Sequence, residues 1–185
     1  MNLWNLPRTA TIGGTRYGIN ADFRDVLEII GYLNDKNKPE FIRWQIALGL
    51  FYDGEIPRQH QQEAAEYMAG FIGYGSGDAK PGPKLIDWEQ DAQIIVGDVN
   101  KVAGVLDIRS VPFLHWWTFL SYFYSVGEGQ LSTIVSIRAK RQKGKKLEKW
   151  EEEYYRANKS RVDLKTRYSA EDLAEQQRLN ALLGE

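Results

Sequence analysis

The chain has 185 residues, which is enough for one domain with a full hydrophobic core and short for two, and its 43% hydrophobic and 26% charged residues are typical of soluble globular proteins. It contains no cysteine, which excludes disulfide bonds and thiolate metal sites and fits a reducing compartment. The formal net charge is −1, but residues 1–107 carry 10 Lys and Arg against 15 Asp and Glu, whereas residues 108–185 carry 14 against 10. An acidic first part and a basic second part can attract each other or other copies of the chain.

The first predicted element is a β-hairpin within residues 8–19. Its β-prone pieces surround Gly13 and Gly14, a pair that suits the positive φ angles of a two-residue turn. A lone hairpin is marginal in water, so we expect it to pack on a helix. Three helices are predicted next: one over residues 22–33, one that Pro39 opens and that ends at Asp53–Gly54, and one that Pro57 opens.

A loop is predicted over residues 73–83, which contain four Gly and two Pro. Its Gly-rich start is superficially similar to a phosphate-binding loop. Such a loop needs a buried strand before it and a Gly-Lys-Ser/Thr ending, and the sequence has neither. The segment is therefore interpreted as a connection without a nucleotide site.

A central helix is predicted from Asp87 to about Asp107, with Asp87 and Gln90 as a loose capping box. The aromatic run 111–124 follows, and Pro112 is placed as the first residue of its helix because proline loses no hydrogen bond there. The run is too short and too polar to span a bilayer, which needs roughly 20 apolar residues. It is therefore interpreted as a core helix or as a surface that another protein covers.

Trp116 and Trp117 are adjacent and point about 100° apart on a helix. We therefore predict that one is deeply buried and that the other lies at the margin. The tryptophans are interpreted as core residues, with a groove for a partner helix as the alternative. Arg138 lies on the next predicted helix, and we expect its guanidinium to stack on Trp116 or Trp117.

Residues 138–146 contain six cations and no acid. Three interpretations are open: a solvated helix end whose cations complement the helix dipole, a contact with an acidic protein, or a contact with nucleic acid phosphates. Several of these cations, together with tryptophans that could contact a partner, form the predicted partner-binding set. Its members are Trp116, Trp117, Arg138, Lys140, Arg141, Lys143 and Trp150.

The end of the chain differs from the rest. The predicted division is a helical body over residues 1–145, which includes the hairpin, and a charged helical tail over residues 146–185. Residues 146–155 favour a helix with a thin apolar stripe, residues 157–161 a linker, and Ser169 the start of a last helix. The predicted fold class is mainly α, a single helical domain with a short N-terminal β-hairpin and a helical C-terminal tail.

No catalytic, metal or cofactor site can be nominated. His60 and His115 are the only histidines and have no ligand cluster at zinc-site spacing. The acids of residues 87–91 fit a helix start and those of residues 151–153 a solvated helix face, so neither group favours general acid–base chemistry. We expect a protein that is not an enzyme and needs no cofactor.

The strongest family signal is His115-Trp116-Trp117 with Phe119, followed by a polar turn, the segment from Ile134 to Arg138 and the lysine-rich run. Two upstream stretches add to it: the Gly13-Gly14 turn with the start of the first helix, and Asp87–Asp91 with Ile94 and Ile95. Together these residues resemble the bacteriophage family called gene product fifteen over about residues 8–145.

The resemblance implies a small helical tail assembly chaperone of long-tailed phages and prophages. The implied partners are the tape-measure protein and the tail tube protein, with a possible homo-oligomer and no membrane. Met1–Pro7 has neither the basic start nor the apolar run of a secretory signal, so we expect the cytoplasm of the bacterial host. The alternative is a nucleic-acid-binding phage regulatory protein that uses residues 138–146, although nucleic acid is the less favoured partner.

Overall fold

The computed structural model describes residues 4–74, 82–165 and 174. Its described residues form two compact units, which we name the strand unit (8–20 and 24–68) and the aromatic unit (4–7, 21–23, 69–74 and 82–165). Both are mainly helical, as predicted, and the strand unit also contains one small antiparallel sheet. The division differs from the predicted body and tail, because residues 146–165 belong to the same unit as residues 82–145.

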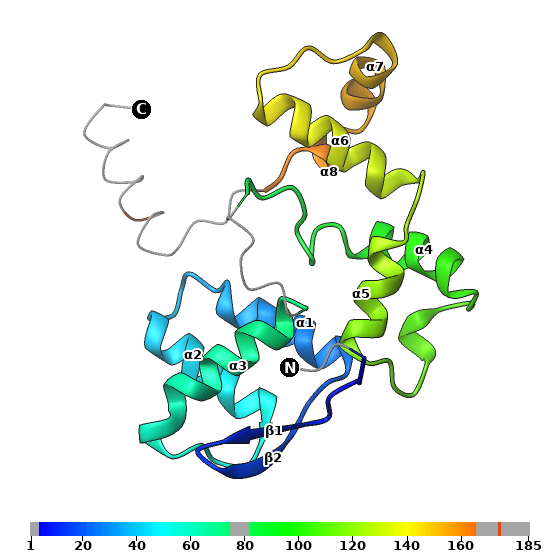
Figure 1. The fold of residues 1–185 in the computed structure, drawn as a ribbon. Coiled ribbons are helices and arrows are strands. Elements are labelled where there is room, and N and C mark those ends of the chain that lie inside the picture. Colours follow the sequence, from blue (N-terminus) through cyan, green and yellow to red (C-terminus); the bar gives the residue numbers. More distant parts are fainter. Residues whose placement is uncertain (1–3, 75–81, 166–173, 175–185) are drawn as a thin grey trace. The chain divides into compact units, whose positions relative to one another are not determined.

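The sheet of the strand unit begins with the predicted hairpin (Figure 1). Strands β1 (Thr9–Ile12) and β2 (Thr15–Ile19) pair antiparallel. Gly13 and Gly14 turn the chain at φ angles of 55° and 79°, which residues with a side chain rarely adopt. A third strand, β3 (Tyr52–Asp53), pairs with β2 and was not predicted, because two residues are too short to show a period in the sequence.

The rest of the strand unit is built from helical segments close to the predicted ones. Pro39 caps the second of them, as expected, whereas a short 3₁₀ turn separates Pro57 from the third. The Tyr52 hydroxyl donates a hydrogen bond to the Ala64 carbonyl at 2.8 Å and so links β3 to the third helix. The bounds are α1 Phe23–Leu33, α2 Glu40–Phe51, η1 Arg58–His60 and α3 Gln61–Ile72. The first residue of α1 and residues 69–72 at the end of α3 belong to the aromatic unit.

The aromatic unit contains the remaining elements. Its first helix is shorter than predicted, because the backbone N–H groups of Glu89 and Gln90 bond to the Asp87 side chain in a turn that precedes the helix. Gly104, at φ 66°, ends that helix. The bounds are α4 Ala92–Ala103, η2 Ile108–Ser110, α5 Trp116–Tyr124, α6 Gln130–Gln142, α7 Lys149–Ala157 and α8 Lys159–Val162.

Helix α5 begins at Trp116, so the placement of its start at Pro112 is wrong. The chain before it is extended and pairs with residues 21–23: Phe23 N–H donates to the Leu114 carbonyl at 2.9 Å, and Trp116 N–H to the Ala21 carbonyl at 2.8 Å. Nδ1 of His115 then accepts a hydrogen bond from Trp117 N–H at 3.1 Å and caps the helix. Pairing over a long sequence separation has overridden the local preference of proline.

The predicted tail is partly core. Leu147, Tyr154 and Tyr155 pack against a buried cluster of Ile134, Ile137 and Val162. Helix α8 occupies most of residues 157–161, so the prediction of a linker there is wrong. The helix predicted from Ser169 and residues 75–81 of the predicted loop lie outside the described residues. In the part of the chain that is described, no helix combines the length and the apolar character that a membrane span requires.

Both tryptophans of α5 are buried, which contradicts the prediction of one buried and one marginal ring. Trp116 is 1% exposed and Trp117 is 2% exposed. Their indole N–H groups donate to the Ile72 carbonyl at 3.0 Å and the Phe71 carbonyl at 2.9 Å. Those carbonyls end α3, where a helix leaves its last acceptors without internal partners. Two rings that point apart can both be buried because the core surrounds α5 on more than one side.

We predict that Trp116→Ala and Trp117→Ala each lower the free energy of unfolding by about 3–5 kcal/mol, because each removes a large buried ring together with its indole hydrogen bond to a helix carbonyl. Tyr124→Ala on the same helix is the control, since Tyr124 is 69% exposed, and it should change stability by less than about 1 kcal/mol. Denaturant titration of the three variants measures this. A loss at only one tryptophan would contradict the assignment.

Candidate protein-binding surfaces

Three of the seven predicted partner-binding residues are not on the surface. Trp116 and Trp117 are core residues, and the side chain of Arg138 is 4% exposed. They offer a partner almost no surface of their own, although Trp117 lines a hollow that is described below. These three side chains are therefore not exposed contact residues, whereas Lys140, Arg141, Lys143 and Trp150 keep part or all of their surface.

Arg138 is the polar centre of the aromatic unit. Nη1 and Nη2 bond to the two carboxylate oxygens of Asp91 at 2.6 and 2.9 Å. The remaining donors reach the backbone carbonyls of Leu85, Arg161 and Val162 at 2.6 to 2.8 Å. All five N–H groups of the guanidinium are thus used, which a buried charge requires. The expected stacking on a tryptophan is wrong, because these partners hold the guanidinium elsewhere.

Two more cations of the run bind acids of the segment that follows it. Lys140 Nζ lies 2.7 and 2.8 Å from the two carboxylate oxygens of Glu151, which is almost fully buried. The hydrogen bond from Lys140, with a second from Glu148 N–H, holds the pKa of Glu151 below its ordinary value, and the same contact raises the pKa of Lys140. Arg141 pairs with Asp163, and its guanidinium carbon lies 4.0 Å from the centre of the Tyr155 ring.

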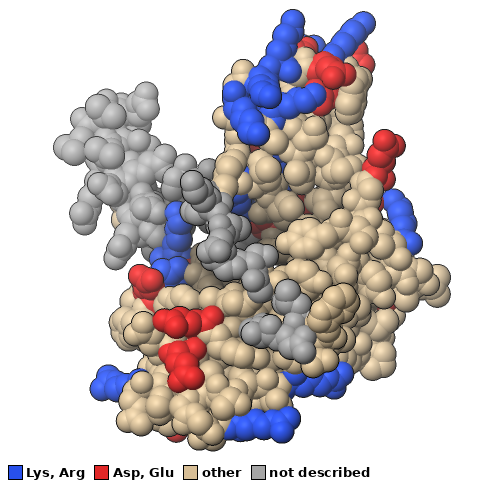
Figure 2. All heavy atoms as spheres, viewed as in Figure 1, with Lys and Arg blue, Asp and Glu red and all other residues tan. Residues whose placement is uncertain are grey.

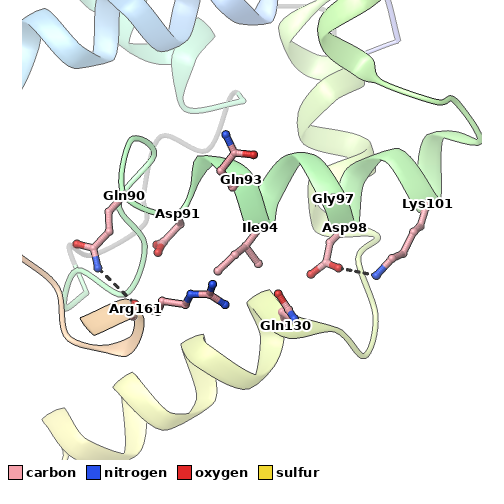
Figure 3. Close-up of a pocket in the computed structure, with 9 residues that line it drawn as sticks. All are labelled: Gln90, Asp91, Gln93, Ile94, Gly97, Asp98, Lys101, Gln130 and Arg161. Atoms are coloured by element: carbon pink, nitrogen blue, oxygen red, sulfur yellow. Dashed lines mark hydrogen bonds and ion pairs between the residues drawn. The ribbon is translucent and has the colours of Figure 1, made fainter. Parts of the chain in front are cut away.

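A crevice of about 520 Å³ lies along α4, between it and α6 and α8 (Figure 3). Its carboxylates already have partners: Asp91 binds Arg138, and Asp98 accepts from Leu131 N–H at 3.1 Å and from Lys101 at 3.0 Å. Asp98 comes so close to Gly129 that a Cβ there would lie 2.8 Å from a carboxylate oxygen. The crevice is therefore explained by internal contacts of the fold, with Asp98 capping α6.

A second hollow, of about 420 Å³, follows the outer side of α5. We name it the α5 groove. Its lining contains no charged side chain. Leu6, Tyr74 and Val102 line it and are themselves exposed apolar residues. The sequence pattern does not reveal this surface, because its members come from four separate segments and show no shared period. The lining residues are Leu6, Tyr74, Val102, Trp117, Thr118, Ser121, Tyr122 and Ser125.

The remaining three cations of the run, together with Lys149 at the start of α7, form an exposed basic turn after α6. Figure 2 shows Lys and Arg side chains gathered at the top of the view, where Figure 1 places α7. Lys143, Lys145, Lys146 and Lys149 are exposed, and Trp150 beside them is 52% exposed. Within residues 4–74 and 82–165, no carboxylate lies in salt-bridge range of these four lysines.

The described residues contain no group of three or more His, Asp or Glu that could hold a metal ion. His115 serves as the helix cap, and its Nε2 lies 3.0 Å from the Pro7 carbonyl. His60 lies 3.7 Å from a carboxylate oxygen of Glu63. The two candidate surfaces are thus the uncharged α5 groove and the basic turn, and both suit contacts with another macromolecule.

Arg138→Met should lower the free energy of unfolding by about 3–5 kcal/mol, because it leaves the buried Asp91 carboxylate unpaired. Arg141→Met, at an exposed pair, should cost less than about 1 kcal/mol. Adding Asp91→Asn to Arg138→Met should cost less than the sum of the two single changes, since no buried charge then remains. Denaturant titration gives all four values, and strictly additive losses would exclude the coupling.

The Lys140–Glu151 pair predicts a specific pH dependence. The folded pKa of Glu151 is lowered, so the pair stabilises the fold fully above the unfolded pKa of about 4.3 and loses this contribution as pH falls through the folded pKa. Glu151→Gln should therefore be less stable than the parent protein at neutral pH, with a difference that shrinks below about pH 4. Glu153→Gln, exposed on the same helix, is the control. An unchanged difference at about pH 3 would contradict the role of the charge.

The comparison with protein families agrees with the resemblance found in the sequence. The chain matches the model described as Bacteriophage Gp15 protein over residues 4–164. The match extends beyond residues 8–145 and includes α7 and α8. Neither the curated proteins nor the solved structures contain a match to this chain. Because the family model covers most of its length, the chain belongs to the Bacteriophage Gp15 protein family.

Proposed function

We propose that the protein is a non-enzymatic phage tail assembly chaperone, which binds the tape-measure protein and/or tail tube subunits in the host cytoplasm during tail morphogenesis. Membership in a phage protein family supports a role in the phage life cycle. The observation that carries the proposal is the α5 groove, an uncharged hollow with exposed apolar side chains on a small helical protein.

The groove has the chemistry that an amphipathic helix needs. A long helical protein that has not yet assembled exposes apolar stripes, and such stripes bind in hydrophobic grooves through side chains spaced three and four residues apart. Leu6, Tyr74 and Val102 supply exposed apolar side chains to its lining, which also includes the largely buried Trp117. Ser121, Ser125 and Tyr122 add hydroxyl groups that can pair with a partner backbone.

The alternative, a nucleic-acid-binding regulator, has less support. It was motivated by the six cations of residues 138–146, and Arg138, Lys140 and Arg141 bind Asp91, Glu151 and Asp163 within the protein. Only the last three cations of that run remain for phosphates. Nucleic acid binders gain most of their affinity from many phosphate contacts, and a reduced set lowers it.

The test is coexpression with the tape-measure protein encoded in the same phage or prophage genome. The chain should copurify with it and raise its soluble fraction, because a covered apolar stripe no longer aggregates. Ser121→Glu places a charge in the α5 groove and should lower the affinity at least about tenfold. Ser136→Glu is the matched control, an exposed serine on α6 that does not line the groove.

Two results would count against the proposal. The first is a tape-measure protein that is equally insoluble with and without the chain, and tail tube subunits that do not copurify with it. The second is equal binding by Ser121→Glu and Ser136→Glu, which would remove the α5 groove as the binding surface. Unfolding curves of both serine variants should match that of the parent protein, since both positions are exposed.

A further inference from the structure

The cations of residues 138–149 fall into two groups with different surroundings. Arg138, Lys140 and Arg141 face inward or along α7 and α8, and each has a carboxylate partner. Lys143, Lys145, Lys146 and Lys149 follow and have no such partner among the described residues. Helix α6 ends at Gln142, so a favourable contact with its dipole explains Lys143 but not the later lysines.

The backbone of the basic turn is fixed. Gly144 has φ 62°, Gly144 N–H donates to the Arg141 carbonyl at 3.0 Å, and Lys145 N–H donates to the Lys140 carbonyl at 2.8 Å. These two bonds are the pattern of a Schellman motif, which closes a helix with a left-handed glycine. At the other end, Leu147 packs on the buried cluster and Glu148 N–H bonds to Glu151 at 2.9 Å. The lysines therefore stand on a preorganised turn, and a partner would lose little entropy in ordering it.

The charges of the turn do not serve the fold. Lys149 is the first residue of α7, where the helix dipole favours acids over cations. Four lysines within seven residues also repel one another, and an anionic partner would relieve that repulsion. Trp150 follows directly and keeps half of its surface exposed, with its N–H bonded to Glu148 at 3.0 Å. An exposed tryptophan beside cations is a typical centre of a protein interface.

The surroundings limit the kind of anion. Glu148, Glu152 and Glu153 lie in and next to the turn on α7. An extended polyanion such as a nucleic acid would meet these carboxylates soon after leaving the lysines, and like charges disfavour it. A short acidic segment of a protein can pair with the lysines alone and place an apolar side chain on Trp150.

We propose that Lys143, Lys145, Lys146 and Lys149, together with Trp150, form a docking site for a short acidic, amphipathic segment of a partner protein. The site names the partner chemistry for the protein-binding role proposed above and rests on that role. It lies on residues other than those of the α5 groove. A partner can therefore engage the two surfaces through different parts of its chain.

The experiment uses the full chain and three fluorescent probes. The first is a helical peptide of about 18 residues with glutamates and a leucine stripe. The second replaces every glutamate by glutamine, and the third is a DNA duplex of about 20 base pairs. At about 0.1 M salt the acidic peptide should bind more tightly than the other two probes, and its affinity should fall as salt rises.

A variant with Lys143→Gln, Lys145→Gln and Lys146→Gln should bind the acidic peptide at least about tenfold more weakly. The control is Lys36→Gln, Arg58→Gln and Lys159→Gln, three exposed cations outside the turn with the same loss of charge. Trp150→Ala should also weaken binding without altering its dependence on salt. Equal binding by the two triple variants would overturn the proposal, and so would tighter binding of DNA than of the acidic peptide.

The two proposals can fail separately. If the acidic peptide binds through the turn but the tape-measure protein and tail tube subunits do not copurify with the chain, the docking site stands and the chaperone role falls. If the tape-measure protein copurifies equally with both triple variants, and the two triple variants bind the acidic peptide equally well, the chaperone role stands and the docking site falls.

Discussion

The bidentate pair between Arg138 and Asp91 is the contact on which the aromatic unit depends. It joins the middle of α6 to the start of α4, and its other donors hold the carbonyls of Leu85, Arg161 and Val162. A buried ion pair adds little net stability compared with apolar packing, but it tolerates only one arrangement of its partners. Its value here is specificity: it fixes where α8 returns to α6, and so places the basic turn that connects α6 with α7.

The local parts of the fold follow from the sequence. The Gly13-Gly14 turn, α1 and the start of α2 at Pro39 were predicted because each depends on residues within a few positions of one another. The start of α5 was missed for the opposite reason. Its extended approach depends on residues 21–23, which are about 90 positions away and leave no local pattern. Helix propensity describes the conformation that an isolated segment prefers, whereas pairing with residues 21–23 determined where α5 begins.

The candidate surfaces show the same limit. The sequence identified the cations of residues 138–146 as a group but could not divide them, because the acids that bind Arg138, Lys140 and Arg141 lie 11 to 47 residues away. It also treated the tryptophans as possible contact residues, since an apolar stripe looks the same whether the core or a partner covers it. Trp150 was already in the predicted partner-binding set, whereas the α5 groove, which draws on four segments, became apparent only from the folded chain.

The α5 groove and the basic turn differ in chemistry, and this difference bears on the proposed role. A chaperone must hold its partner and later release it, so its contacts should be numerous and individually weak. A small uncharged groove contributes through apolar burial, which salt does not weaken, whereas exposed lysines contribute through charge, which salt screens. Two modest surfaces on one unit can together retain a partner through avidity. Each can still be displaced separately when the partner's own assembly contacts begin to form.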